Sequence, residues 1–403
     1  MFAGANFLVG LLLARWLDTV AYGAVSLVYS FLVFAGTLQF AFIIEPMVVY
    51  GSGRFGAFFR EYKRYIKRAN LWIAFGLGLF FALLGLLAHW SGSSTLAHSF
   101  WGYAIAVPAV FFFWLERQTA YVFLKPQKAA LGSAVYLGLY TSITLFLHVN
   151  FMLNSFTASL TAGVSSYFSS VVMARGLVYQ ESAEEIALDL REVYALHWKY
   201  GRWAAIANML AWIPSYLPFI LLPLFHGFEA GARFRAVLNF IVPSWQFNGS
   251  ISRVLTPALV RAASGKGVGL LARRAFAALV TLGTIYWLVV ALFNKELAVI
   301  FYNGKYLEDI GVLQWFGLVS VLRAAVVVLE AWLRAVENPK ALARAYVASL
   351  SFSVPALVFF IYALGPSGAA VSILVAELLY LAGLLHQVGL NSALLVFMRK
   401  SKG

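Results

Sequence analysis

The 403-residue chain contains no cysteine and has few charged residues of either sign. The absence of cysteine excludes disulfide bonds and thiolate metal sites. Charged residues make up 11% and hydrophobic residues 62% of the chain, against roughly 25% and 45–50% in soluble domains. A soluble fold of this length needs more polar surface. The apolar runs are unbroken and do not alternate as in barrel strands. We therefore predict an all-α, polytopic membrane protein.

Catalytic and nucleotide-binding signatures are missing as well. The sequence has no GxxxxGK[ST], HExxH or GxSxG pattern, and its six histidines are scattered. We therefore expect no catalytic residue, no metal site and no cofactor, and a transporter instead of an enzyme. No signal-peptide pattern precedes the first apolar run, which is so short that we expect the true start upstream of Met1.

Apolar runs of about 20 residues predict about twelve membrane helices. The expected spans are 2–17, 23–49, 70–89, 99–116, 130–148, 155–173, 203–225, 232–256, 275–294, 312–333, 343–363 and 368–388. They form an N-terminal six-helix lobe at 1–173 and a C-terminal lobe at 203–403 that ends in a short basic tail. The acid-rich connection 174–202 is expected to be an amphipathic helix on the membrane surface or a soluble linker helix.

Charge placement and internal similarity orient the predicted spans. Most of the 30 Lys and Arg residues lie in alternate connections and in the tail, so the positive-inside rule places both termini in the cytoplasm. The net charge of +14 is then an orientation signal and not a nucleic-acid-binding surface. Similarities between WLDTVAYGA and FHGFEAGAR, and between LKPQKAA and ENPKALA, indicate parallel repeats with a pseudo-two-fold axis along the membrane normal.

Polar residues follow one another along the eighth span. In the span 232–256 the following residues share one helical face, and Pro243 lies in the same stripe: Arg235, Asn239, Gln246, Ser250 and Arg253. Such a face is either a polar seam packed against neighbouring helices or the wall of a water-filled, anion-attracting cavity.

Charged residues in the tenth and twelfth spans complement one another. Arg323 lies near the middle of the tenth span, and Glu330 is placed to pair with Arg334 four residues later. Glu377 in the twelfth span is the expected counter-ion of Arg323. These residues form either a buried structural ion pair or a charge relay that exchanges partners during transport.

Two further features suggest bends or coupling. Glu45 precedes Pro46 about one turn from the cytoplasmic interface, where it either anchors a bent helix end or couples transport to a proton. Pro214, Pro218 and Pro223 must interrupt the hydrogen bonds of the seventh span, which predicts either a hinge or a permanent kink.

The first half of the chain contains two further patterns, which are less specific. One recurs at every fourth residue and consists of Tyr136, Tyr140, Thr144 and His148. It indicates helix packing with an interfacial aromatic belt or, alternatively, stacking against sugars. The span 155–173 is rich in Ser and Thr, which favour close helix packing.

Several stretches resemble one known family. The motif LLAR-x-L followed by YG stands at Leu12 to Leu17 and at Tyr22–Gly23. Further similar stretches are IIEPMVVYG at 43–51, FRAVLNFIVP at 234–243 and LTPAL at 255–259. From residue 5 to about 390 the chain resembles the polysaccharide (O-antigen-type) flippases. These share a superfamily with the lipid II flippase and the multidrug and toxin extrusion transporters.

The resemblance implies two helical bundles around a cavity that opens alternately to either side of the bacterial inner membrane. The implied cargo is an undecaprenyl-diphosphate-linked oligosaccharide for surface polysaccharide synthesis. Its implied partners are membrane lipids and the polymerase and glycosyltransferases of the same pathway. In the lipid II branch an arginine also occupies the place of Arg15, whereas the basic residue of the eighth helix lies one turn from the place of Arg235.

Together with the polar residues above, the resemblance defines a set of expected site residues. The cations expected to hold the pyrophosphate are Arg15, Arg235, Arg253 and Arg323, with Asn239, Gln246 and Ser250 as polar lining. Glu45, Glu330 and Glu377 are expected to couple transport to H⁺ or Na⁺ or to form ion pairs. Alternative functions are a drug or metabolite antiporter of the same fold and, less favoured, a membrane polymerase or ligase of lipid-linked glycans.

Overall fold

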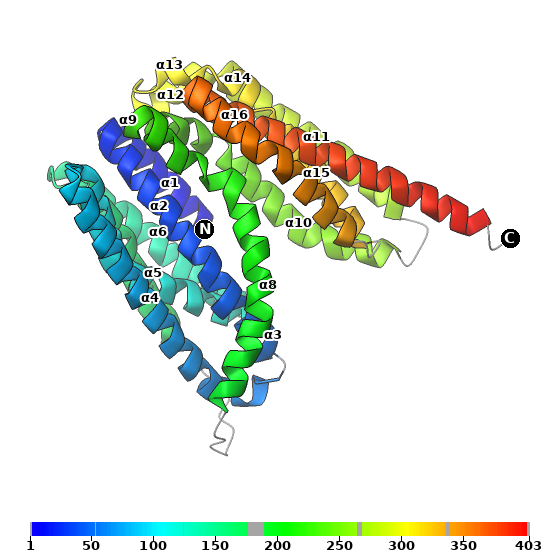
Figure 1. The fold of residues 1–403 in the computed structure, drawn as a ribbon, viewed down its shortest axis with the longest axis horizontal. Coiled ribbons are helices and arrows are strands. Elements are labelled where there is room, and N and C mark those ends of the chain that lie inside the picture. The colour runs from blue at the N-terminus through cyan, green and yellow to red at the C-terminus, as the bar shows by residue number, and fades with distance from the viewer. Residues whose placement is uncertain are drawn as a thin grey trace. The chain divides into compact units, whose positions relative to one another are not determined.

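The computed structural model describes residues 2–52, 54–123, 125–175, 189–263, 268–335 and 339–400. Within these residues the chain is helical and has no strand, as expected from its composition. Seven of the described helices are long and apolar enough to cross a membrane. Contacts group the chain into two compact units, Met1–Ile220 and Leu221–Gly403. The elements can be followed from the blue to the red end of the ribbon (Figure 1).

The first unit contains the helices up to the start of α9. They are α1 Phe2–Trp16, α2 Thr19–Gln39, the π-helical turn η1 Phe40–Ile44, α3 Glu45–Ser52, the 3₁₀ turn η2 Gly56–Phe58, α4 Phe59–Trp90, α5 Ser94–Val122, α6 Pro126–Val149, α7 Ser155–Ala174 and α8 Leu190–Tyr216. The second unit continues with α9 Pro218–Asn239, α10 Val242–Ala263, α11 Val268–Leu292, α12 Asn294–Tyr302, α13 Leu307–Ile310, α14 Leu313–Phe316, α15 Val319–Ala335 and α16 Pro339–Lys400.

Helix α5 packs most extensively against α7 and α4. The approach to α7 is close enough that a Cβ on Gly102 would lie 2.8 Å from the Cβ of Ser159. The hydroxyls of Ser159, Ser169 and Ser170 are buried and donate to carbonyls of their own helix. Small side chains that satisfy themselves in this way allow tight packing, and the packing expected for 155–173 is confirmed.

The aromatic stripe on α6 is a packing feature. Tyr136, Tyr140 and Thr144 are buried, and the Tyr136 ring stacks on Phe113 with centroids 5.2 Å apart. His148 stacks on Trp16 of α1 at 4.2 Å. The described contacts therefore account for the stripe without sugar stacking.

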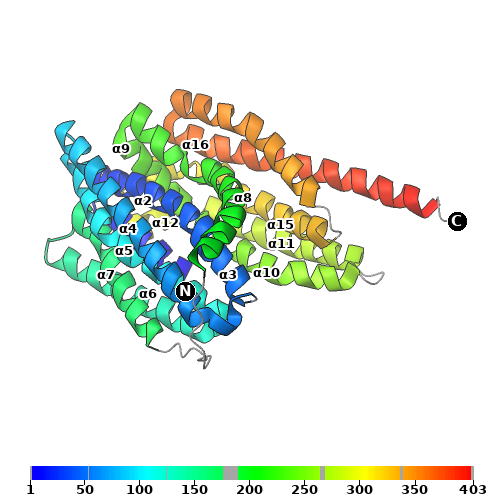
Figure 2. The ribbon, with the colours of Figure 1, turned by 60° about the horizontal axis from the view of Figure 1, so that its bottom comes forward.

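Helix α8 differs from the expected linker and seventh span. Residues 176–188 of the expected connection 174–202 lie outside the described part of the chain. From Leu190 to Tyr216 the helix is continuous, so the remainder of that connection is the first half of α8. The helix packs against α2 and η1 (Figure 2), which places 203–220 in the first compact unit, whereas the sequence analysis grouped these residues with the second lobe.

The second unit contains several helix breaks. Gly227 adopts a φ of 80° and Gly365 a φ of 56°, both of which favour glycine. The break at Gly365 falls between the two last expected spans. Nε2 of His226 lies 2.8 Å from the carbonyl oxygen of Ile361, so the imidazole contacts a carbonyl just before that break.

The eighth span is not a single helix, and this expectation was wrong. Helix α9 ends at Asn239 and α10 begins at Val242, with a turn at 240–241. The shared helical face of the residues between Arg235 and Arg253 therefore does not exist as predicted. Proline fits the first turn of a helix, so Pro243 marks the start of α10 and not a point within a longer helix.

Candidate functional site

A cluster of charged side chains lies between α15 and α16 in the second unit. The expected pair is present, because a terminal guanidinium nitrogen of Arg323 lies 3.5 Å from Oε1 of Glu377. The Arg323 side chain is 34% exposed and that of Glu377 15%. Oε2 of Glu377 is buried and accepts no hydrogen bond from the described residues. A buried oxygen without a donor is costly, so this carboxylate is incompletely neutralised.

Glu330 forms the second half of the cluster. Its Oε2 lies 3.1 Å from a guanidinium nitrogen of Arg334, which confirms the expected i,i+4 pair. Its Oε1 accepts a 2.9 Å hydrogen bond from the hydroxyl of Tyr380. The Tyr380 ring in turn packs edge-on against Tyr346 at 5.3 Å. Both oxygens of Glu330 are therefore occupied, in contrast to those of Glu377.

A buried apolar core lies between the same two helices. Val326 and Leu333 of α15 pack with Ala341, Ala345 and Leu384 of α16 in a buried core. Apolar surroundings strengthen electrostatic interactions among the four charges. The cluster contains two guanidinium groups and two carboxylates and is neutral as a whole. An added anion must therefore replace a carboxylate as the partner of an arginine or change the protonation state of a carboxylate.

The remaining residues of the expected cavity are placed separately. Arg15 is exposed on α1, and Arg235 is partly buried on α9. Asn239 is buried, and its Nδ2 lies 3.3 Å from the hydroxyl of Tyr302, which makes it part of a packed seam. Arg253 lies in α10, but its side chain is outside the described part.

The last two polar residues of the eighth span lie on α10. Gln246 and Ser250 are exposed. The Ser250 hydroxyl donates to the Gln246 carbonyl at 2.9 Å, within the same helix. Their side chains therefore stay available at the surface of the second unit.

The prolines of the expected hinge flank a break between two helices. Pro214 lies in the last turn of α8, α9 begins at Pro218, and Pro223 lies within α9. The amide of Leu217 still donates to the carbonyl of Ile213 at 3.0 Å. The interruption is therefore local, and a hinge role remains a prediction.

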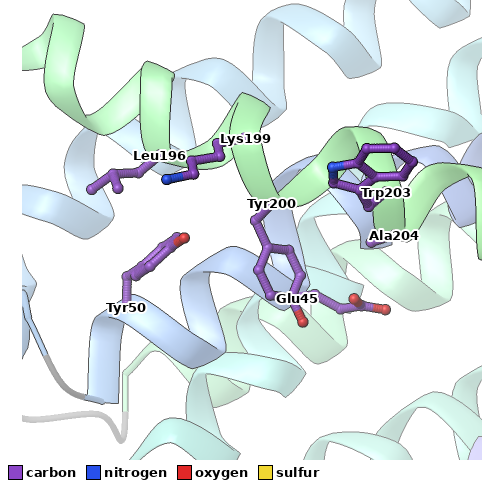
Figure 3. Close-up of a pocket in the computed structure, with 7 residues that line it drawn as sticks. All are labelled: Glu45, Tyr50, Leu196, Lys199, Tyr200, Trp203 and Ala204. Carbon is purple, nitrogen blue, oxygen red and sulfur yellow. The ribbon is translucent and has the colours of Figure 1, made fainter. Parts of the chain in front are cut away.

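In the first unit, Glu45 follows the π-helical turn η1 directly. Its Oε1 accepts a hydrogen bond of 3.3 Å from Nδ2 of Asn208 on α8. Tyr200 of α8 also bonds to Glu45, and burial, followed by the charge of Glu45, raises the pKa of the tyrosine. Glu45 lines a pocket of about 490 Å³ (Figure 3). π-Helical turns frequently occur at functional sites.

His197 bridges α8 to this π-helical turn. Its Nδ1 lies 2.7 Å from the Phe42 carbonyl oxygen, and its Nε2 lies 2.7 Å from the Tyr62 hydroxyl. Burial lowers the pKa of His197, and the hydrogen bond to the Phe42 carbonyl opposes this shift. The imidazole thus holds α4, η1 and α8 together, which the sequence analysis did not anticipate.

An ion pair in the first unit was also not predicted from the sequence. Nζ of Lys63 lies 2.6 Å from Oε2 of Glu116, and the side chains are only 8% and 2% exposed. Nearby, Nε2 of Gln39 donates to Oδ1 of Asn70 at 2.7 Å. Lys63 lies in the basic connection between the expected spans 23–49 and 70–89, where its charge does not stand out. The available signal was Glu116, an acid at the end of an otherwise apolar run that requires a partner.

The fold is that of transporters of the MOP superfamily, multi-pass membrane proteins. An inward-facing MATE multidrug transporter matches over 98% of this chain and 95% of its own, with a TM-score of 0.79 and 14% identity. The lipid II flippase MurJ in an inward closed conformation matches over 96% and 85%, with a TM-score of 0.72 and 12% identity.

A MOP-superfamily transporter from Pyrococcus furiosus, described by a binding pocket of reverse polarity, also has this fold. It matches over 97% of this chain and 91% of its own, with a TM-score of 0.62 and 14% identity. No protein-family model matches the sequence, and no curated protein does. At these identities the likeness establishes the fold, while the cargo must be argued from the site.

Proposed function

We propose that the protein is a flippase that moves an undecaprenyl-diphosphate-linked oligosaccharide across the bacterial inner membrane, with both termini in the cytoplasm. The sequence motifs resemble those of polysaccharide flippases, and MurJ, which has the same fold, is a lipid II flippase. A diphosphate cannot cross about 30 Å of hydrocarbon without compensating charge. Such a function therefore requires cations within the helical bundle.

The incompletely neutralised pair of Arg323 and Glu377 carries this proposal. At 3.5 Å the contact is longer than an optimal charge-assisted hydrogen bond of about 2.7–2.9 Å. A phosphate oxygen can therefore replace Glu377 as the partner of Arg323 with little loss. The released carboxylate then binds a proton or Na⁺, which couples cargo binding to an ion.

Other residues are proposed to contact the cargo as well. Arg15, Arg235 and Arg253 each offer a cation to the diphosphate, and Gln246 and Ser250 offer hydrogen bonds to the headgroup. The prolines around Leu217 permit the bending that alternating access requires. The cargo passes to the polymerase of the same pathway, after glycosyltransferases have assembled it.

A drug or metabolite antiporter is the second candidate function. The likeness to MATE transporters supports it, because these have the same helical arrangement. The flippase is favoured if Arg15, Arg235 and Arg253 join the neutral cluster along the path. Together they give an excess of arginines, which attract an anionic headgroup and repel the cations that such antiporters commonly handle.

The test is translocation by the purified full-length protein in liposomes. A fluorescent undecaprenyl-diphosphate oligosaccharide is placed in both leaflets, and a membrane-impermeant quencher reports its movement. We expect Arg323→Ala and Arg253→Ala to lower the rate about 10- to 100-fold, as for the loss of a hydrogen bond to a charged group. The matched control is Arg344→Ala, an exposed position on α16.

Two results would contradict the proposal. Full activity of both arginine variants would remove the cation path. Uptake of a cationic drug without any movement of the lipid-linked oligosaccharide would establish the antiporter instead.

A further inference from the structure

The pocket beside Glu45 is a separate feature of the first unit. It is formed by α3 and α8, and its lining residues are Glu45, Tyr50, Leu196, Lys199, Tyr200, Trp203 and Ala204 (Figure 3). Its volume of about 490 Å³ lies within the usual range of small-molecule sites, about 300–1,000 Å³. The charge relay proposed above uses none of these residues.

Among the described residues, Glu45 has hydrogen-bond donors but no cationic partner. Asn208 and Tyr200 bond to its carboxylate, whereas the ion pairs formed among the described residues do not include Glu45. A partly buried carboxylate in a membrane helix is costly unless a cation neutralises it. The site therefore calls for a cationic group from a ligand.

The other side of the pocket is positive. In Figure 3 the Lys199 ammonium and the Glu45 carboxylate point away from each other on either side of the Tyr200 ring. The two groups form no ion pair with each other. Tyr50, Tyr200 and Trp203 supply aromatic rings, which attract ammonium groups. A cavity with a negative and a positive end suits a dipolar ligand better than a simple cation.

The length of the helix that carries Glu45 predicts that the pocket lies at the depth of lipid headgroups. The helical stretch Thr19–Gly51 has 33 residues, about 50 Å at 1.5 Å per residue, and exceeds the hydrocarbon thickness of about 30 Å. Glu45 and Tyr50 lie in its last two turns, just before the basic segment that begins at Arg54. Tyrosine and tryptophan are typical of this interfacial layer, but an aromatic belt alone does not require a carboxylate.

We propose that this pocket binds the zwitterionic phosphoethanolamine headgroup of a membrane lipid. The ammonium group lies against Glu45 and the aromatic rings, and the phosphate lies against Lys199. The acyl chains remain in the bilayer. The lipid is a bound component of the first unit and not the transported cargo, so this site does not depend on the proposed function.

The test measures lipid binding by delipidated full-length protein in detergent. Phosphatidylethanolamine, phosphatidylcholine and phosphatidylglycerol with identical acyl chains are titrated separately, and bound lipid is counted by native mass spectrometry. We expect phosphatidylethanolamine to bind about tenfold more tightly than phosphatidylglycerol, as for one hydrogen-bonded charge. Phosphatidylcholine keeps the positive charge but has no N–H donor, and it should bind between the two.

Variants test the two ends of the pocket separately. Glu45→Gln should abolish the preference for phosphatidylethanolamine, and Tyr200→Phe should weaken it. Lys199→Gln should weaken the binding of all three lipids, because each carries the phosphate. The matched controls, Glu296→Gln and Lys295→Gln, are exposed on α12 and should leave both the preference and the affinity unchanged. Because Lys199 is exposed, Lys199→Gln tests the site even if Glu45→Gln does not fold.

A competition arm tests the headgroup itself. Soluble phosphoethanolamine should displace the lipid better than ethanolamine, because only the former engages both ends. Equal binding of the three lipids to the wild type would overturn the proposal. So would unchanged selectivity in the folded Glu45 variant, unchanged affinity in the folded Lys199 variant, or equal competition by ethanolamine.

Discussion

The two units contain ion pairs of the same chemistry but different geometry. In the first unit, Lys63 and Glu116 lie 2.6 Å apart and are almost inaccessible. In the second unit, Arg323 and Glu377 lie 3.5 Å apart, Arg323 is about one-third exposed, and one oxygen of Glu377 accepts no hydrogen bond from the part of the chain that the structure describes. The short pair has nothing to gain from a new partner, whereas the long pair does. The comparison indicates a structural role for the first pair and an exchangeable role for the second.

The largest effect on stability is expected in the first unit. Glu116→Leu alone removes the carboxylate that faces the buried Lys63 ammonium, and the loss of one member of a buried ion pair typically destabilises a protein by about 3–5 kcal/mol. The double variant Lys63→Met/Glu116→Leu should recover most of this loss, because no charge stays buried. Unfolding in mixed detergent micelles measures both. An equal loss in the single and double variants would contradict a buried pair.

A smaller effect on stability is expected at Arg323. Arg323→Gln should cost about 1–2 kcal/mol, because the partly exposed pair is weak and Glu377 can take up a proton. Unfolding under the same conditions measures this cost, with Arg344→Gln as the control. A loss as large as that of Glu116→Leu would remove the difference between the units.

Acid should weaken the first unit through His197. Burial lowers the pKa of His197 in the folded protein. In the unfolded chain the histidine has its ordinary pKa of about 6.5 and therefore takes up a proton at a higher pH. The stability contributed by neutral His197 is therefore complete above this value and decreases as the pH falls towards the folded pKa. His197→Gln should flatten the pH dependence of unfolding between about pH 7 and 5. An unchanged slope would exclude His197 as its source.

The smallest effect is expected at Arg334. Arg334→Gln removes a partly exposed i,i+4 contact to Glu330, while Tyr380 still donates to Glu330. Such pairs contribute about 0.3–0.5 kcal/mol. The midpoint of unfolding should hardly change. A cost above about 2 kcal/mol would contradict the prediction that the contact between Arg334 and Glu330 is weak.

Composition and helical spacing were sufficient for the all-α membrane fold and for two ion pairs. Arg323, Glu330 and Glu377 stand out because charges are rare within apolar runs and require partners. Lys63 does not stand out, since it belongs to a basic segment of similar residues, and only the tertiary structure shows that it is buried. The positions of the ionisable residues thus predicted the pair of Arg323 and Glu377, because both residues lie within apolar spans.

Helix breaks were harder to predict than helices. The turn at 240–241 lies in an apolar stretch, and hydropathy does not distinguish a broken helix from a continuous one. Pro243 was the available signal, because proline is favoured in the first turn of a helix. Gly227 and Gly365 fell at connections already expected between spans. The π-helical turn before Glu45, which packs against α8, has no comparable sequence signal.

The central claim is that cargo replaces Glu377 at Arg323 and that the released carboxylate takes up an ion. Calorimetric titration of the protein with undecaprenyl diphosphate, in sodium-free buffers of different ionisation enthalpy, measures proton uptake directly. We predict uptake of about one proton per bound ligand by the wild type and none by Glu377→Gln, with binding retained in both. Equal proton uptake by the two proteins would contradict the account.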